Sequence, residues 1–487
     1  MNVLLSLLQK STDYNQLLKA VEAKQAVAVS GLSQAPRSHV LAAAHEQSGR
    51  PLVAVCQDDM AAKRLASELG AFLGEEPPVL PSRELTLAGA IGVSRQWEQQ
   101  RLRLLYALAQ GRVPVLVASL DALLLRTLPR QTLFSASVTL RVGAEYSMPE
   151  LIERLTRAGY SRASLVEGVG QFALRGGILD VYSPAQEKPL RAEFFGDELD
   201  TMGYFDPITQ RRTENVEEAV LLPVAETEPH LHPQGISGLC EDLRAIIARQ
   251  QRRKTPNQAL IETLQKDCEA LENETLFASA DRYMALIYPE FTTAASYLPQ
   301  EAIVAFCDHG NLQRGEKDRA EEFGLLLDSF LTSGTLFGEL CDYYATMDDL
   351  AASLRGRAVI YCDSFLAARY PESLPPKQLL SFTARQLPGY GGSLETAAAD
   401  LKNYASNQYG SIVLCGGQRR GEILKELLAK SGLNALLSFP LTKLPQPGQI
   451  LIAGGSLPAG LEYPTLKFAI LTEGQIAVRQ ERKRVRA

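Results

Sequence analysis

Short apolar runs alternate with amphipathic stretches along the first part of the chain. Gln25–Ser30, Pro51–Cys56 and Val113–Ser119 are continuous apolar runs of the length expected for strands buried on both faces. Between them, Asp58–Leu73 and Ser94–Gln110 carry apolar residues at the spacing of a helix. Because strands and helices alternate, the pattern predicts an α/β domain with a doubly wound parallel sheet.

The pattern changes between residues 137 and 224, where short strand-like runs dominate. Dipeptides that favour turns separate these runs: Gly176-Gly177, Ser183-Pro184, Gly196-Asp197 and Asp206-Pro207. Short strands joined by frequent turns are typical of antiparallel pairing. We therefore predict a small β-rich domain at residues 131–224, inserted into the α/β domain.

Helical periodicity returns after the predicted insert, at Leu239–Gln250 and Gln258–Leu271. The apolar run Ala302–Cys307 follows, and we expect it to rejoin the first sheet as a further strand. The first domain is then discontinuous and comprises residues 1–130 and 225–335.

A second α/β domain is predicted at residues 336–475, and its role is left open. Its candidate strands begin at Ala358, Ser411, Gln449 and Leu466, with a helix at Gly421–Ser431 between the second and third. The last stretch, residues 476–487, is basic and has no apolar face, which favours a solvated linker.

Composition and charge narrow the class of protein. The net charge of −6 argues against a broadly basic surface for nucleic acid, although a local basic patch is still compatible with it. The seven cysteines are widely spaced, without a C-x-x-C pair, and several lie in apolar runs, which favours reduced, buried thiols. A short apolar N-terminus without preceding basic residues argues against a signal peptide. We therefore expect a cytoplasmic protein that has no membrane partner.

The residues after the first strand have the spacing of a phosphate-binding loop with its key positions replaced. Gly31 and Ser38 occupy the first and last positions of G-x-x-x-x-G-K-[ST], in which backbone N–H groups and a lysine hold phosphates. Pro36 replaces the second glycine, and it lacks an N–H and the glycine-type turn. Arg37 replaces the lysine, and its planar fork differs from a compact ammonium. The loop is therefore predicted not to bind nucleotide.

The second nucleotide motif is altered as well. Helicases place an Asp-Glu pair at the end of a strand to hold magnesium and orient water. Here Ala302–Cys307 is followed by Asp308 and His309, and histidine lacks the carboxylate charge. The residues favour a helicase-derived scaffold that has lost its chemistry, with no catalytic residue, metal or cofactor in this segment.

One long segment matches a known pattern. Residues 170–213 read GQFALRGGILDVYSPAQEKPLRAEFFGDELDTMGYFDPITQRRT. Their R-G-G-hydrophobic-hydrophobic-D, R-hydrophobic-E-F-F and F-D-x-x-T-Q-R elements resemble a module shared by the excinuclease component UvrB and the transcription-repair coupling factor family. The later stretch FTARQLPGYGGSLETAAADLKNYA is similar to the coupling factors rather than to UvrB. The interval that begins at Pro81 leaves no room for the DNA-clamping hairpin of UvrB.

The resemblance implies an N-terminal segment of a coupling factor, with a degenerate P-loop domain, the β-rich insert and a second α/β domain. In that family the insert docks the excinuclease ABC component UvrA and brings repair enzymes to RNA polymerase stalled at DNA lesions. Contacts with RNA polymerase and DNA, and a motor that uses ATP and magnesium, belong to domains downstream of this chain. Carried over by position, the docking residues are Arg175, Arg191, Phe194 and Phe195.

Alternatives stay open for the docking residues. Neighbouring strand positions face opposite sides, so one of Phe194 and Phe195 is expected to be buried and the other exposed. Both could instead belong to the core. Arg175 could be a turn residue that pairs with Asp180 or Glu193.

Two other functions remain as alternatives for the whole chain. The first is an active DNA-dependent ATPase of the UvrB type, which would need the lysine and the acidic pair that are missing. The second is an unrelated α/β enzyme that uses a glycine-rich loop such as Gly416-Gly417 or Gly454-Gly455, but such pairs are common at turns.

Overall fold

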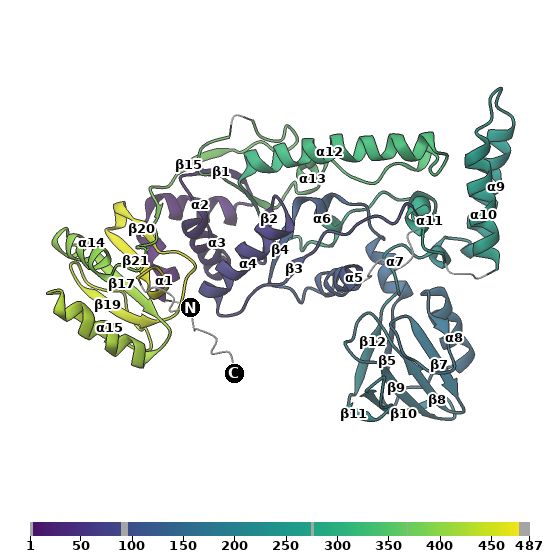
Figure 1. Cartoon of the computed structure of the whole chain (residues 1–487), viewed down its shortest axis with the longest axis horizontal. Helices are drawn as coiled ribbons and strands as arrows, with labels where there is room; N and C mark the ends of the chain where they lie inside the picture. The colour runs from purple at the N-terminus through teal and green to yellow at the C-terminus, as the bar shows by residue number, and fades with distance from the viewer. Residues whose placement is uncertain (1–2, 89–95, 274–276, 368, 477–487) are drawn as a thin grey trace, which may run out of the picture.

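A seven-stranded sheet forms the centre of the molecule (Figure 1). The computed structural model describes residues 3–88, 96–273, 277–367 and 369–476. Every neighbouring pair in the sheet is parallel. In spatial order the strands are β15 (Gln378–Ser381), β1 (Ala26–Ser30), β14 (Ala358–Cys362), β13 (Ile303–Cys307), β2 (Leu52–Cys56), β4 (Val115–Ser119) and β3 (Val79–Leu80).

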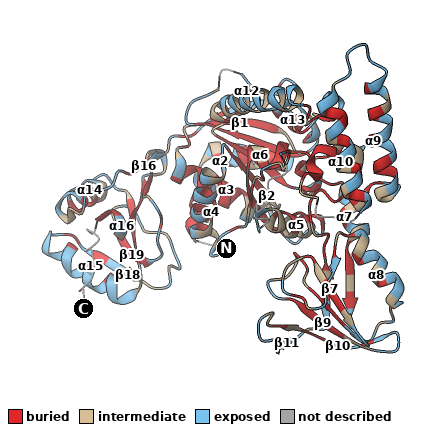
Figure 2. Ribbon diagram, turned by 45° about the vertical axis from the view of Figure 1, so that its right-hand side comes forward, coloured by how far each residue is buried: buried red, intermediate tan, exposed pale blue. Residues whose placement is uncertain are grey.

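Helices cover both faces of this sheet, which explains why its inner strands are buried at every position and mostly apolar. Val27 and Val29 of β1 point into the core formed with α3 (Gln34–Ser48) and α4 (Asp59–Leu73). Ala26 and Ala28 point into the opposite core, built with α5 (Gln96–Ala109), α6 (Leu120–Leu124) and the 3-10 helix η4 (Ala294–Tyr297). Figure 2 shows the strands as a buried layer between helices whose outer faces are exposed.

The predicted helix-strand alternation is confirmed for this domain. The run Ala302–Cys307 does return to the first sheet, since β13 pairs with β2 on one side and β14 on the other. Local signals also define α4: the Asp58 side chain accepts a hydrogen bond from the N–H of Ala61, and Gly74 ends the helix in the left-handed conformation.

One predicted boundary is wrong. The sequence pattern assigns the strand beginning at Ala358 to the second α/β domain, but β14 lies between β1 and β13 in the first sheet, and β15 also pairs there. The first domain therefore extends past residue 336 to about residue 381. The long helix α12 (His309–Thr332) and α13 (Met347–Ser353) connect β13 to β14. An apolar run shows that a strand is buried, but it does not show which sheet contains the strand.

The second sheet has six strands and the helices α14 (Leu394–Ser406), α15 (Gln418–Lys430) and α16 (Glu473–Ile476). In spatial order its strands are β16 (Arg385–Gln386), β20 (Leu461–Tyr463), β21 (Phe468–Thr472), β17 (Gly410–Cys415), β19 (Ile450–Gly454) and β18 (Ala435–Ser438). One face packs on the first domain, because Ile412 and Tyr463 share a core with residues of α3. There His39 Nδ1 lies 2.9 Å from the Tyr463 hydroxyl.

The β-rich insert contains a six-stranded sheet covered on one face by α8 (Met148–Arg157) and a two-stranded pair. The pair consists of β5 (Val138–Arg141) and β12 (Glu218–Leu221), which run antiparallel with Val138 opposite Leu221. The two ends of the insert thus lie side by side where it leaves the first domain (Figure 1). The larger sheet comprises β11 (Arg212–Asn215), β10 (Glu198–Phe205), β9 (Leu190–Phe195), β8 (Ile178–Val181), β7 (Gln171–Arg175) and β6 (Ser161–Arg162).

After the insert, α9 (Gly235–Gln251) and α10 (Gln258–Glu272) form a hairpin that projects beside the first domain (Figure 1). Among the described residues, no helix is both long enough and apolar enough to cross a membrane. The remaining short helices are α1 (Val3–Ser6), η1 (Leu7–Lys10), α2 (Thr12–Glu22), α7 (Arg130–Ala136), η2 (Pro229–Leu231), η3 (Ala280–Tyr283), α11 (Met284–Ile287), η5 (Gly338–Leu340) and η6 (Pro464–Leu466).

Candidate docking surface and degenerate nucleotide site

The loop at the degenerate nucleotide site is short. Helix α3 begins at Gln34, so only three residues separate it from β1, and Pro36 lies within its first turn. Proline is tolerated there because the first N–H groups of a helix have no helical partner. Gly31 has φ +80°, and a Cβ at this position would lie 1.9 Å from the carbonyl oxygen of Phe382. Gly31 is therefore needed for the close approach of the chain after β15.

Arg37 and Asp308 contact each other directly. The Arg37 side chain is almost fully buried, and its Nη1 lies 2.8 Å from Asp308 Oδ2. These residues occupy the positions of the lysine and the acidic residue in an intact site. Each satisfies the charge of the other, so neither is free to hold a phosphate or a magnesium ion without breaking the pair.

Ser38 is also engaged within the protein. Its hydroxyl donates a 2.5 Å hydrogen bond to Glu68 Oε2, and both residues are buried. Glu68 comes from α4, 30 residues further along, and no motif in the sequence identifies it. The hydroxyl that would bind magnesium in an intact loop therefore already has a hydrogen-bond partner within the protein.

His309 points away from the other residues of this group. Its ring is fully buried, lies 5.1 Å from the ring of Tyr370 in a stacked arrangement and meets Tyr361 edge-on. Tyr361 belongs to the core on the opposite face of the sheet from Cys307. Burial lowers the pKa of His309 to about 4, so the ring is neutral at pH 7. The structure thus brings Arg37 and Asp308 together but separates His309 from them.

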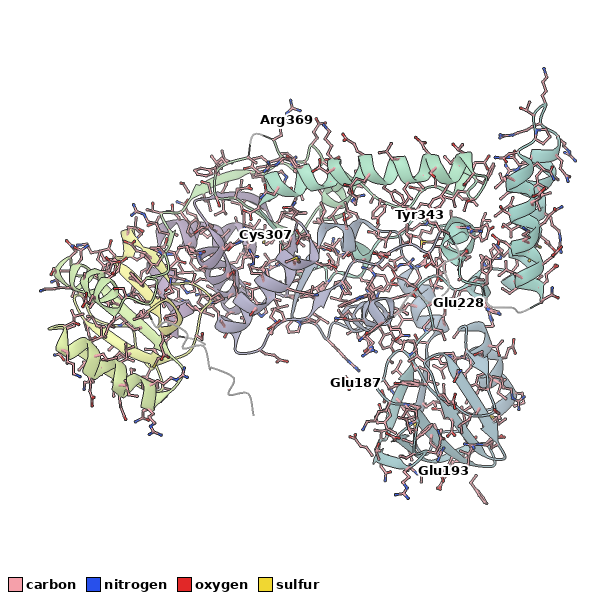
Figure 3. The ribbon with its side chains drawn as sticks, in the orientation of Figure 1. Glu187, Glu193, Glu228, Cys307, Tyr343 and Arg369 are labelled. Carbon is pink, nitrogen blue, oxygen red and sulfur yellow. The ribbon has the colours of Figure 1, made fainter. Side chains whose placement is uncertain are left out.

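The outer face of the insert sheet gathers a second group of residues, which we call the docking surface: Arg175, Ile178, Asp180, Arg191 and Phe195. Strand pairing explains the grouping, because Asp180 lies opposite Arg191 across β8 and β9, and Arg175 lies opposite Ile178. Ala192 and Leu190 alternate with these positions and point into the insert core. Glu193 lies on β9, and Figure 3 shows it at the end of the insert that is far from the first domain.

Asp180 holds both candidate arginines. Its carboxylate is buried, and its two oxygens accept hydrogen bonds of 2.7 and 2.9 Å from the Arg191 guanidinium. Arg175 donates a third bond of 2.6 Å, with its side chain half exposed. Paired bonds of this kind fix the plane of a guanidinium. Of the two partners suggested for Arg175, Asp180 is right, and Glu193 pairs with Arg212 instead.

Arg191 is held from two further sides. Its guanidinium carbon lies 4.5 Å from the ring centroid of buried Phe205, and Nη1 donates to the carbonyl oxygen of Gln210. The hydrogen bonds to Asp180 raise the pKa of Arg191, so that it stays charged at every ordinary pH. The arginine is thus fixed in position before any partner arrives.

The two phenylalanines have opposite environments, as strand alternation predicted. Phe195 is 85% exposed, whereas Phe194 packs on the insert core and meets the Tyr146 ring edge-on at 6.3 Å. The alternative that both belong to the core is wrong. Phe195 is therefore an apolar side chain that the insert presents to solvent on the same sheet face as Arg191, while Phe194 supports the sheet.

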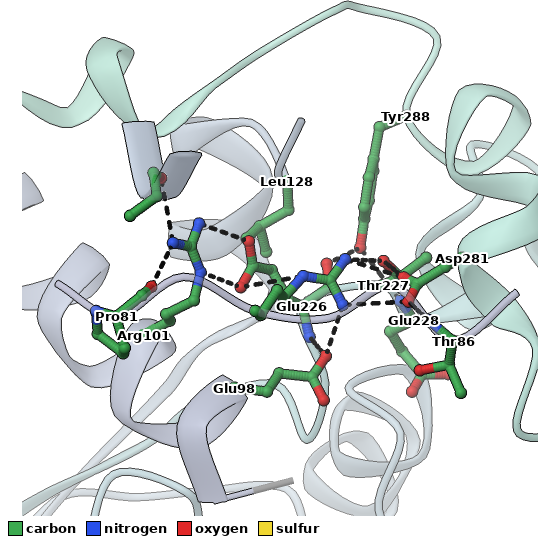
Figure 4. A network of polar contacts seen from close by, with 12 residues as sticks. Pro81, Thr86, Glu98, Arg101, Leu128, Glu226, Thr227, Glu228, Asp281 and Tyr288 are labelled. Carbon is green, nitrogen blue, oxygen red and sulfur yellow. Dashed lines mark hydrogen bonds and ion pairs between the residues drawn. The ribbon is translucent and has the colours of Figure 1, made fainter. Parts of the chain in front are cut away.

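A buried polar network lies where the chain re-enters the first domain after the insert (Figure 4). Glu226 follows the insert and accepts two hydrogen bonds from Arg101, at 2.9 and 3.1 Å. Arg83 lies between Glu226 and Asp281, and its Nη2 is 2.8 Å from Asp281 Oδ1. Burial opposes ionisation of Glu226, but the two guanidiniums outweigh it and hold the pKa of Glu226 below its usual value. Thr227 completes the network by donating to Asp281.

Two other groups have ligand-like residues. Cys240, Cys268 and Glu272 have ligand atoms within 4.8 Å of one another, but the Arg244 guanidinium already pairs with Glu272. The glycines Gly416 and Gly455 line a cavity of about 1050 Å³ in the second α/β domain. There the N–H of Gly416 donates to Glu473, a carboxylate of the same chain.

Comparison with known proteins agrees with these features. Residues 138–226 match the family model described as UvrB interaction domain. The matched range begins with β5 and ends at Glu226, so it covers the insert and the first residues after it. The chain therefore carries an interaction domain of the UvrB type on a helicase-like α/β scaffold.

The relatives found by sequence are named transcription-repair-coupling factors. One from Staphylococcus aureus (strain USA300) is 26% identical over 495 residues, which cover 99% of this chain and 41% of the relative. One from Bacillus subtilis (strain 168) is 23% identical over 487 residues, which cover 98% of this chain and 40% of the relative. These matches confirm the resemblance that the sequence indicated. The chain spans about two fifths of the length of the curated relatives it matches.

Proposed function

We propose that this chain recruits the excinuclease component UvrA through the docking surface and has no ATPase activity of its own. In the longer coupling factor, this role would bring excision repair to RNA polymerase stalled at DNA lesions. Regions outside this chain would bind RNA polymerase and DNA. A motor domain that uses ATP and magnesium would also lie in those regions. The observation that carries the proposal is an exposed Phe195 on the same sheet face as arginines that Asp180 holds in place, within the UvrB interaction domain.

The arrangement has the character of a binding hot spot. Arginine and aromatic residues are enriched at the centres of protein interfaces, because they contribute much contact area and directional bonds. A partner that covers Phe195 would remove an exposed apolar ring from water, and Arg175 still has exposed N–H groups for acidic groups of the partner. Since the arginines are already ordered, binding loses little side-chain entropy.

We expect Phe195→Ala to weaken binding of UvrA by about 30-fold or more, equivalent to about 2 kcal/mol. Isothermal titration calorimetry with purified UvrA measures the change. Because Phe195 is exposed, its removal should leave the melting temperature unchanged. Leu325→Ala is the matched control, since Leu325 is 73% exposed on α12, outside the insert, and its loss should not change the affinity. Equal affinity of Phe195→Ala and wild type would reject the docking surface.

The proposal that the nucleotide site is inactive has its own test. We expect magnesium and ATP at millimolar concentration to leave the melting temperature unchanged, because Arg37, Ser38 and Asp308 are engaged within the protein. A site with a Kd one hundred times lower than the ATP concentration would add about 2.7 kcal/mol to the stability. Differential scanning fluorimetry with and without magnesium distinguishes the two outcomes. Stabilisation that Arg37→Ala abolishes would favour the alternative of an active ATPase.

A further inference from the structure

Three cysteines end three neighbouring strands of the first sheet. Cys56, Cys307 and Cys362 are the last residues of β2, β13 and β14. Cys307 is paired in register with Cys362, and the residues before Cys56 and Cys307 are paired with each other. All three side chains point to the same face of the sheet, into the core that includes α3 and α4. The carboxyl edge of the sheet therefore carries a row of adjacent thiols.

Two of these thiols border a cavity that the degenerate nucleotide site leaves open. Cys56 and Cys307 line a pocket of about 340 Å³ together with Arg37, Glu68 and Asp308. Cys362 is fully buried and is not part of the pocket lining. Cys307 lies near the middle of the first domain in Figure 3. A small polar molecule can therefore reach Cys56 and Cys307 through this pocket.

The two lining thiols also interact with each other. A hydrogen bond from Cys56 lowers the pKa of Cys307; burial opposes this shift, Arg37 supports it, and Asp308 and Glu68 oppose it. The same contact and burial raise the pKa of Cys56. The strand register and the shared pocket thus place the two thiols next to each other, so that one can attack an oxidant and the other can react with the product.

We propose that this pocket is an oxidation site, at which a small hydroperoxide converts Cys56 and Cys307 into a disulfide. The Cys307 thiolate attacks the peroxide oxygen, which forms a sulfenic acid and releases hydroxide, or an alkoxide from an organic peroxide. The Cys56 sulfur then displaces the hydroxyl from the sulfenic acid, and the Cys56 proton leaves with it as water. With hydrogen peroxide, the overall change is two thiols and one peroxide to one disulfide and two waters.

The strand spacing permits this bridge. Neighbouring strands lie about 4.8 Å apart, and Cα atoms joined by a disulfide are usually about 4.4–6.8 Å apart. Both cysteines lie at strand ends, where small backbone shifts can bring the sulfur atoms together without breaking the centre of the sheet. The bridge would join β2 to β13 within the lining of the pocket.

The test treats the reduced full chain with hydrogen peroxide for increasing times, followed by alkylation and mass spectrometry without reduction. Cys56, Cys307 and Cys362 lie on different tryptic peptides, so each possible bridge is distinguishable. We expect a Cys56–Cys307 cross-linked peptide that a dithiol reductant reverses. Its formation should be roughly tenfold faster than oxidation of Cys415, a buried thiol in the second α/β domain that lines another pocket.

Two variants assign the roles of the thiols. Cys362→Ser should keep the Cys56–Cys307 bridge, while Cys56→Ser should leave Cys307 as a sulfenic acid that a dimedone probe traps. The proposal is overturned if the bridge joins Cys307 to Cys362, if Cys307 is oxidised without forming a bridge in the wild-type chain, or if neither thiol reacts faster than Cys415. All three outcomes are read from the wild-type protein, so they do not depend on whether the variants fold.

Discussion

Replacing Glu226 by glutamine should destabilise the first domain and its junction with the insert by about 3 kcal/mol or more. The substitution keeps the shape of the side chain but removes the charge that faces Arg101 and Arg83, and all three side chains are almost fully buried. A buried guanidinium without its carboxylate loses the interaction that compensates its lost hydration. Hydrogen exchange of α5 and of the segment around Asp281, together with urea unfolding, measures the loss.

The pH dependence of this effect has a definite sign. Since the pKa of Glu226 is lowered in the folded protein, the network contributes its full stability above the ordinary carboxyl pKa of 4.5. The contribution is lost as the pH falls through the lower folded-state pKa. The stability difference between wild type and Glu226→Gln should therefore shrink at acidic pH. Glu339→Gln is the matched control, because Glu339 pairs with Arg249 on the surface and its loss should cost less than about 1 kcal/mol. A difference this small for Glu226→Gln would contradict the prediction.

The second large effect concerns Asp180. On the proposed docking mechanism, Asp180→Ala should weaken binding of UvrA by at least about tenfold, although its carboxylate is only 1% exposed and is not available to a partner. Without it, Arg175 and Arg191 lose the acceptor that orients them, so binding must order both side chains. Calorimetric titration of wild type, Asp180→Ala, Arg191→Ala and the double variant measures the effect.

The combination of variants distinguishes a role of Asp180 in positioning Arg191 from a role in the stability of the fold. If Asp180 acts through Arg191, the double variant should bind only slightly more weakly than Arg191→Ala alone, because the two losses are not additive. Glu193→Gln is the control, since Glu193 on β9 holds Arg212 on β11, two strands away, rather than the two candidate arginines. Additive losses for Asp180→Ala and Arg191→Ala, or an unchanged affinity of Asp180→Ala, would show that the carboxylate does not position the arginine.

Much of the fold follows from local pattern, and the errors have a physical cause. Continuous apolar runs correctly predicted β1, β2, β4 and β13, because strands buried on both faces need apolar residues at every position. The same rule could not assign β14 to a sheet. That assignment depends on how α12 and α13 cross the sheet, and this is a tertiary property absent from the periodicity.

Some features of the two sites could also be predicted from the sequence, and others could not. Alternation along β9 was sufficient to predict that Phe194 and Phe195 face opposite sides. The sequence left two carboxylates, Asp180 and Glu193, as possible partners of Arg175. The register of β7 and β8 shows that Asp180 is the partner. The bond between Ser38 and Glu68 had no signal at all, because it joins two helices through side chains that belong to no shared motif.

The paired strands β5 and β12 have a consequence for how such a protein can be built and altered. The chain enters and leaves the insert at adjacent positions, Val138 and Leu221. For the first domain the insert is therefore equivalent to one long loop, and the entropy cost of closing a loop grows only slowly with its length. The insert also has its own core, separate from those of the first domain. The insert should therefore fold on its own when it is cut out at the β5–β12 pair. It should also be possible to place it in another protein that offers two neighbouring strand ends.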